Sequence, residues 1–155
     1  MIRTPLTILI TGARDWTDRD TVRHALESAV TAARWQVPEV EPLVVHGACA
    51  FRTHQGRMAS ADLHAAGVAH ELGWPTRPMP AAWDQWGRHA EPIRNRDMVA
   101  WVLARPGLHV CLAFPLPTSR GTWDCVRAAE QAGIPVTIHA RPIDTTWTPA
   151  EGDEP

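Results

Sequence analysis

Short apolar runs alternate with longer amphipathic segments along most of this chain. Leu6–Ile10 is one such run, and Asp18–Ala33 then carries apolar residues at the spacing of a single helical face. Repeats of this order predict strands near residues 6–10, 43–46, 75–78, 108–114 and 134–139. They predict helices near residues 18–33, 60–72 and 92–103, and a last helix that ends at residues 132–133. A tryptophan-rich loop is expected at residues 81–91.

This alternation of short strands and helices indicates the α/β fold class. Parallel neighbouring strands need helical crossovers of a single hand, so helices come to cover both faces of the sheet. We therefore expect a three-layer, Rossmann-like parallel sheet of about five strands. Ligands of such sheets bind outside the carboxyl ends of the strands.

Length and segment composition set the domain organisation. The 155 residues suit a single domain, which we expect over residues 1–141. Residues 142–155 form an acidic segment rich in Pro and Thr, and we expect this tail to be disordered. No apolar run reaches the roughly 18 residues of a bilayer span, and the amino terminus does not resemble a signal peptide. These features predict a soluble, cytoplasmic protein with no membrane partner.

Charge and side-chain usage exclude several classes of function. The net charge of −2 provides no overall field for a polyanion, so non-specific nucleic-acid binding is disfavoured. The chain contains no lysine, which excludes Schiff-base and Walker-type lysine chemistry. Its 3 cysteines are an odd number, and a disulfide framework is not expected.

Polar residues gather after the strands rather than scattering along the chain. The candidate ligand-binding residues in these loops are Gly12, Arg14 and Asp15 after the first strand, Gly47 after the second, and Ser119, Arg120, Gly121 and Thr122 after the fourth. Each glycine allows either a sharp turn out of the strand or the close approach of a ligand. Three such loops on one rim of the sheet favour a nucleotide site.

The loop at residues 119–122 lies between a buried strand and an amphipathic helix. The first backbone N–H groups of a helix have no intrahelical partner and lie at the positive end of the helix dipole. Gly121 would let a phosphate approach these groups, and Arg120 would add a forked cation. The alternative interpretation is that Thr122 only caps the helix after a tight turn.

A further cationic segment begins at Pro92, which we expect to open a helix. The pattern places Arg94, Asn95 and Arg96 in the first helical turn, where cations oppose the helix dipole. A bound phosphate would offset that cost. The alternative is an ion pair of the arginines with Glu91 or Asp97.

A metal site is the next hypothesis that the residues raise. His46, Cys49, His54, Asp62 and His64 could supply ligands, but their spacing matches no common zinc motif, and we predict no metal. Asp62 and His64 are interpreted instead as capping and solvent-facing residues near a helix start. No cofactor is predicted.

Tryptophans offer a possible stacking surface. Trp83, Trp86 and Trp101 could stack on a base, or they could pack in the core or in a lid. The sequence leaves both interpretations open.

Five motifs in order resemble one known family. They are ITGARDW (residues 10–16), VVHGAC (44–49), ADLHAA (61–66), PIRNRDMV (92–99), and LAFP followed by SRGTWDCVRAA and GIPV (within 112–136). Together they resemble the YspA branch of the SLOG superfamily, which actinobacteria and their phages carry. The superfamily includes DprA and the Lonely Guy phosphoribohydrolases. The resemblance implies a Rossmann-like fold that binds a nucleotide or a nucleotide-derived ligand.

The resemblance also suggests roles for single residues. The loop at residues 119–122 is similar to the phosphate loop of the phosphoribohydrolases, and Arg94 or Arg96 is similar to the arginine at their helix start. Those enzymes carry a glutamate where this chain has Cys125, so hydrolysis here would need Asp124 as its carboxylate. The segment Phe51–Met58 replaces a short turn of the relatives and is read as a loop insertion that reshapes or covers the pocket.

Three functions follow as hypotheses. The first is binding of a nucleotide or nucleotide-derived small molecule. The second is hydrolysis of the N-glycosidic bond of nucleoside monophosphates, with Asp124 and Arg94 as catalytic residues. The third is DprA-like binding of single-stranded DNA, which is not favoured. Relatives of this fold commonly pair through helices, so the resemblance is also compatible with a homo-oligomer.

Overall fold

The computed structural model describes residues 2–52 and 58–140, and these residues form an α/β fold around a parallel sheet. Within them the sheet has 5 strands in the order β5-β2-β1-β6-β7, all parallel. The strands are β1 (Thr4–Gly12), β2 (Val40–His46), β5 (Thr76–Pro78), β6 (Leu108–Phe114) and β7 (Val136–Ile138). The predicted fold class is confirmed. The expected tail at 142–155, and His54 in the insertion, lie outside the described residues.

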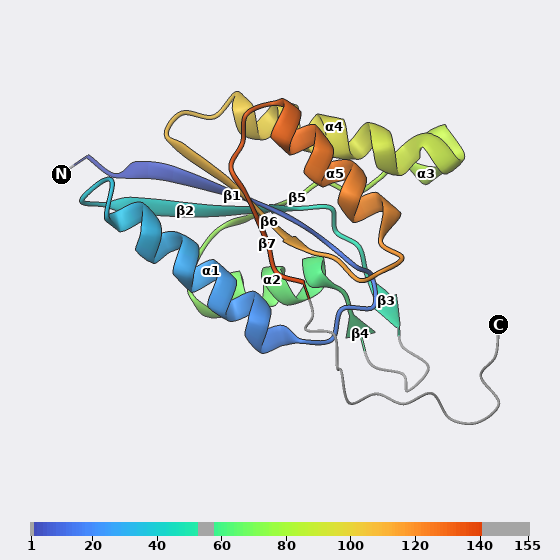
Figure 1. Ribbon diagram of the computed structural model, residues 1–155, viewed down its shortest axis with the longest axis horizontal. Helices are drawn as coiled ribbons and strands as arrows, with labels where there is room; N and C mark the ends of the chain where they lie inside the picture. The colour runs from blue at the N-terminus through green and yellow to red at the C-terminus, as the bar shows by residue number, and fades with distance from the viewer. Residues whose placement is uncertain (1, 53–57, 141–155) are drawn as a thin grey trace.

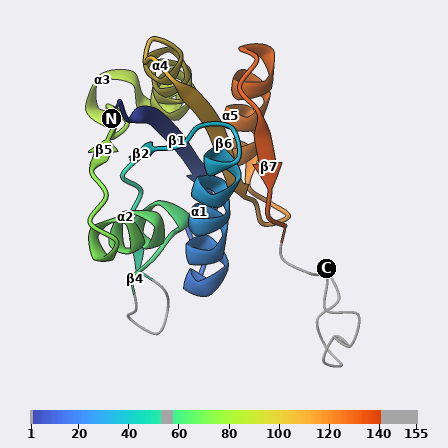
Figure 2. The same cartoon turned by 90° about the vertical axis from the view of Figure 1, so that its left-hand side faces the viewer.

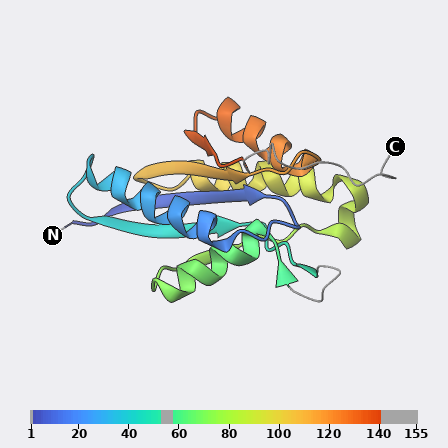
Figure 3. The same ribbon diagram turned by 60° about the horizontal axis from the view of Figure 1, so that its bottom comes forward.

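Helices cover the two faces of the sheet in pairs (Figures 1 and 3). The pair on one face is α1 (Arg19–Arg34) with α2 (Ala61–Glu71), and the pair on the other is α4 (Ala90–Leu103) with α5 (Arg120–Gln131). The first two crossovers lead from β1 outward to β2 and β5, and the chain then returns past β1 to β6 and β7. The direction of winding therefore changes between β1 and β6, which is where open α/β sheets bind ligands.

The central strand is buried on both sides, which explains its continuous apolar run. Leu6, Ile8 and Ile10 point into the core cluster beneath α1 and α2, whereas Leu9 belongs to the cluster beneath α4 and α5. Side chains alternate across a strand, so a strand between two helical layers needs apolar residues at successive positions.

Two helices begin where the sequence predicted. Asp18 caps α1 by accepting the Thr21 amide at 3.1 Å, and Ser60 caps α2 by accepting the Leu63 amide at 2.9 Å. Both caps satisfy a backbone N–H that lacks an intrahelical partner. In each helix, the capping side chain lies directly before the first helical residue.

The start of α4 differs from the prediction. Residues 83–89 form α3 (Trp83–Trp86) and the 3₁₀ turn η1 (Gly87–His89) instead of a loop, and α4 begins at Ala90. Pro92 is therefore the third residue of α4, which is allowed because no N–H of the first turn has a helical acceptor. Arg94, Asn95 and Arg96 consequently lie in the second turn, so the argument from an unfavourable helix dipole does not apply to them.

The remaining elements are small. Residues at the two ends of the insertion form a short antiparallel pair of strands, β3 (Phe51–Arg52) and β4 (Met58–Ala59). The strand β4 lies beside the start of α2 (Figure 2). The sequence had indicated only a loop there. In the described part of the chain, no helix combines the length and apolar character needed to cross a bilayer.

Candidate functional site

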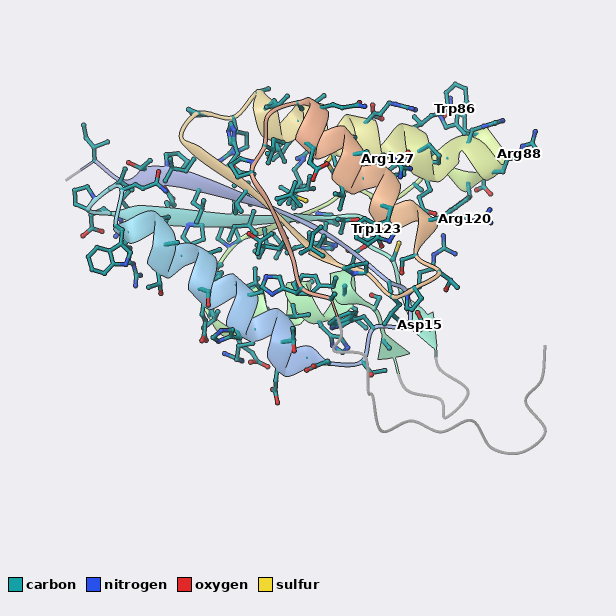
Figure 4. All side chains as sticks on the ribbon, viewed as in Figure 1. Asp15, Trp86, Arg88, Arg120, Trp123 and Arg127 are labelled. Carbon is teal, nitrogen blue, oxygen red and sulfur yellow. The ribbon has the colours of Figure 1, made fainter. Side chains whose placement is uncertain are left out.

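The carboxyl ends of β1 and β6 meet the first turn of α5 around a cavity of about 350 Å³, called here the β1–α5 cavity. Its lining residues are Gly12, Ala13, Arg14, Asp15, Glu91, Thr118, Ser119, Arg120, Gly121 and Thr122. Figure 4 shows Arg120 and Asp15 near this end of the sheet, with Arg127 farther along α5. The structure thus brings together the predicted loops after the first and fourth strands.

The first turn of α5 has no side-chain cap. Ser119 holds the N-cap position, but its side chain makes no capping hydrogen bond. Its Oγ instead accepts the Leu116 amide at 2.9 Å and closes the loop behind the helix. The amides of Gly121 and Thr122, the next positions along α5, therefore have no side-chain acceptor from the N-cap. The interpretation of Thr122 as the cap is wrong, because the helix begins at Arg120.

A second cavity of about 300 Å³, called here the β2–α4 cavity, adjoins the first. Its lining residues are Arg14, Gly47, Ala48, Cys49, Ala50, Pro80, Ala81, Trp83 and Arg94. Arg14 lines both cavities. Its guanidinium pairs with Glu91 at 3.1 Å and lies 5.4 Å from the ring centroid of Trp83. Arg14 therefore separates the two spaces in this conformation.

The glycines of the three loops lie at crowded positions and not at backbone turns that need a positive φ. None of Gly12, Gly47 and Gly121 has a positive φ. A Cβ at Gly12 would overlap Ala61, a Cβ at Gly47 would overlap the guanidinium of Arg94, and one at Gly121 would overlap the Glu91 carboxylate. Close approach does explain these glycines, but in this structure the approaching groups are the protein's own side chains.

Arg94 is buried and serves the framework. Its Nη1 donates to the Gly47 carbonyl at 2.7 Å and, at 3.4 Å, to the Met79 carbonyl, while Nε donates to Asn95 Oδ1 at 3.1 Å. The side chain is only 7% exposed. It therefore ties the loops after β2 and β5 to α4, and only part of it faces the β2–α4 cavity.

Asn95, Arg96 and Asp124 line neither of the two cavities among the described residues. The amide of Asn95 is buried and donates to the Gly121 carbonyl at 3.2 Å and to Asp124 Oδ2 at 3.1 Å. It fixes the start of α5 from behind. Arg96 is exposed on α4. The predicted grouping of Arg94 and Arg96 with the loop at 119–122 is therefore wrong for Arg96 and only partial for Arg94.

The loop after β2 is held rigidly by polar side chains. His46 Nδ1 accepts the Ala48 amide at 3.0 Å, and Asp62 Oδ2 accepts the Cys49 amide at 3.1 Å. Ser60 donates its hydroxyl to the Cys49 carbonyl at 2.6 Å. These bonds stabilise Ala48 in a left-handed conformation with φ of 54°.

Burial shifts the pKa values of two side chains that hold this loop. Desolvation raises the pKa of Asp62 and lowers the pKa of His46, while their mutual attraction opposes both shifts. Asp62 is 5% exposed, so its interpretation as a solvent-facing residue is wrong. His64 likewise has a buried Nε2, without a hydrogen-bond partner in the described structure.

The thiols are poorly suited to nucleophilic chemistry. Burial raises the pKa of Cys49 and raises that of Cys125 to about 11, so both remain protonated near neutral pH. In the described ranges, no three His, Cys, Asp or Glu residues lie close enough together to hold a metal ion. The site offers backbone amides, arginines and an aromatic ring, which suit binding.

The three tryptophans lie in different surroundings. Trp83 is 47% exposed and lines the β2–α4 cavity. Trp101 packs instead against the core cluster beneath α4 and α5, with the guanidinium groups of Arg77 and Arg105 at 4.5 and 5.2 Å from its ring centroid. Trp86 is also exposed but lines neither cavity in the described structure.

Glu91 lines the site, although the sequence indicated it only as an ion-pair partner for the arginines at 94 and 96. It lines the β1–α5 cavity, and its carboxylate lies against Gly121. The local sequence carried one signal for it, since an acidic residue directly before a proline is typical of a first helical turn. Nothing in the sequence indicated that this helix start faces the start of α5.

Comparison with known proteins identifies one informative relative. The chain is 40% identical over 131 residues to the Gene 61 protein of Mycobacterium phage D29, across 83% of this chain and 92% of that protein. The relative's source agrees with the expected occurrence in phages. No protein-family model matches the chain.

Proposed function

The chain belongs to the family of the Gene 61 protein of Mycobacterium phage D29, and we propose that it binds a nucleotide or a nucleotide-derived ligand. The phosphate of the ligand would lie in the β1–α5 cavity. The observation that carries the proposal is the uncapped first turn of α5, which lines this cavity together with Arg14 and Arg120. Arg14, in the loop after β1, and Arg120, at the start of α5, are far apart in the sequence.

Elementary electrostatics supports an anion at this position. Backbone amides at a helix start and the helix dipole together favour a negative group by about 0.3 to 1 kcal/mol at exposed sites. Guanidinium groups add paired donors that match phosphate oxygens. The cavity also lies where the winding of the sheet reverses, between β1 and β6.

The adjoining β2–α4 cavity supports a ligand larger than free phosphate. It shares Arg14 with the first cavity and offers the exposed face of Trp83, on which a base could stack. Gly47 also lines this cavity. The resemblance to the SLOG superfamily points to the same class of ligand.

Titration calorimetry with nucleoside mono-, di- and triphosphates tests the proposal, with the parent nucleosides as controls. Arg120→Gln should weaken nucleotide binding about tenfold, as expected when a charged hydrogen bond worth roughly 1.5 kcal/mol is lost. Arg127→Gln is the matched control, because Arg127 is an exposed arginine on the same helix and lies outside the cavity lining. Undiminished binding by Arg120→Gln, or binding of no nucleotide by the wild type, would overturn the proposal.

Binding is proposed ahead of N-glycosidic hydrolysis because of where Asp124 lies. Its carboxylate accepts from Asn95 and is outside the lining of both cavities in the described structure. Incubation with nucleoside monophosphates and chromatography for free base separates the two functions, and we expect the nucleotides to stay intact. Single-stranded DNA binding stays a prediction, which a gel shift at increasing salt concentration tests.

A further inference from the structure

A carboxylate of the chain itself lies at the position proposed for the ligand's phosphate. Glu91, from the first turn of α4, places its carboxylate against Gly121 in the first turn of α5. Oε2 of the same group accepts from Arg14 Nη2 at 3.1 Å, and Oε1 lies 4.0 Å from Arg94 Nη2. The carboxylate thus lies beside Arg14 and against the first turn of α5, two of the elements proposed to recognise a phosphate.

The Glu91 carboxylate interacts with its surroundings as a bound anion would. A carboxylate near a helix start and beside a guanidinium gains the stabilisation that a phosphate would gain there. A carboxylate and a phosphate cannot share that position, because like charges a few ångströms apart repel. Glu91 and the ligand therefore compete for the same donors.

We propose that Glu91 is an internal competitor that occupies the phosphate position in the unliganded protein and has to leave when the ligand binds. The inference rests on the proposed function and adds a regulatory contact to the same site. Release of Glu91 also frees Arg14, the residue shared by the two cavities, to contact the incoming phosphate. Ligands that lack a strongly anionic group have nothing with which to displace the carboxylate.

The geometry makes this exchange feasible. The Glu91 side chain is 25% exposed and belongs to the cavity wall, so it can swing toward solvent without crossing the core. The alternative role for Glu91 is to accept hydrogen bonds from hydroxyl groups of the ligand, and in that role it would strengthen binding. The two roles predict effects of opposite sign.

Glu91→Gln tests the proposal because it removes the charge and keeps the size of the side chain. At low ionic strength, we expect this variant to bind inorganic phosphate and adenosine monophosphate about tenfold more tightly than the wild type by calorimetry. Asp97→Asn is the matched control, since it removes one exposed negative charge from the same helix outside both cavity linings. The control should bind as the wild type does.

The outcomes separate this inference from the proposed function. Nucleotide binding by the wild type that is unchanged or weakened in Glu91→Gln overturns the role of Glu91 and leaves the proposed function standing. Binding of neither probe by either protein overturns both. A second readout is NMR of the unliganded proteins, in which Glu91→Gln should shift the amide signals of Gly121 and Thr122 more than Asp97→Asn does.

Discussion

The loops after β2 and β6 lie at the same edge of the sheet but are built in opposite ways. In the loop after β2, the Ala48 and Cys49 amides are bonded to buried side chains, and the Gly47 carbonyl receives the Arg94 guanidinium. In the loop after β6, the N-cap side chain turns away from the start of α5. The Glu91 carboxylate lies against that start.

The difference indicates how one sheet edge can be both rigid and open. Buried polar groups that are fully bonded fix a loop in a single conformation. A helix start without a side-chain cap retains donors for another molecule. We infer that the first loop is framework and the second is the binding surface, and three changes test that contrast.

Removal of the buried Arg94 guanidinium is expected to have the largest effect. Arg94→Met should lower the free energy of unfolding by about 3 kcal/mol, because carbonyls of both supporting loops lose a charged donor inside the protein. Urea denaturation measures the change. Arg96→Met is the control on the same helix, where an exposed arginine should matter by less than about 0.5 kcal/mol. If both variants lost the same free energy of unfolding, Arg94 would stabilise the loop after β2 no more than an exposed arginine does.

A second test places the same methyl group in each loop. Gly47→Ala should destabilise the protein by about 2 kcal/mol, because the new Cβ meets a guanidinium that is held on several sides. Gly121→Ala meets only the end of the Glu91 side chain, which can move aside, so we expect a change below about 0.5 kcal/mol. Thermal unfolding of the pair gives the comparison, and a larger loss at Gly121 would reverse it.

The smallest expected effect is a dependence of stability on pH in the first loop. Burial lowers the pKa of His46 in the folded protein, so below about pH 6.5 the unfolded chain takes up its proton first. Neutral His46 therefore makes its full contribution to the free energy of unfolding above about pH 6.5. That contribution is lost as the pH falls toward the pKa of His46 in the folded protein. Burial raises the pKa of Asp62, which gives the opposite slope at lower pH, upward from its usual value of about 3.8.

His46→Asn isolates the histidine contribution. The amide oxygen of asparagine can accept the Ala48 amide in place of Nδ1, but it does not titrate. Melting temperatures measured between pH 5 and pH 8 should therefore fall less steeply on acidification for the variant than for the wild type. Parallel profiles would show that His46 does not couple the loop to pH.

The sequence predicted the elements of the fold well because their signals are local. The strand at Leu108–Phe114 was placed at its observed bounds, and α1 was placed within one residue from its apolar spacing. The start of α4 was misplaced because a proline is equally acceptable at several positions of a first turn. The short helical segments at 83–89 were missed because they bury no side chain and so lack an apolar period.

For the site, the sequence by itself determined that glycine, arginine and hydroxyl residues follow the strands, and parallel topology then brings them to one edge. Only the tertiary structure decided their roles. In the folded protein, Arg94 is buried and donates to backbone carbonyls, Arg96 is exposed, and the Glu91 carboxylate lies against Gly121. The physical reason is that these roles depend on contacts between residues about 30 to 50 positions apart, whose packing no local pattern encodes.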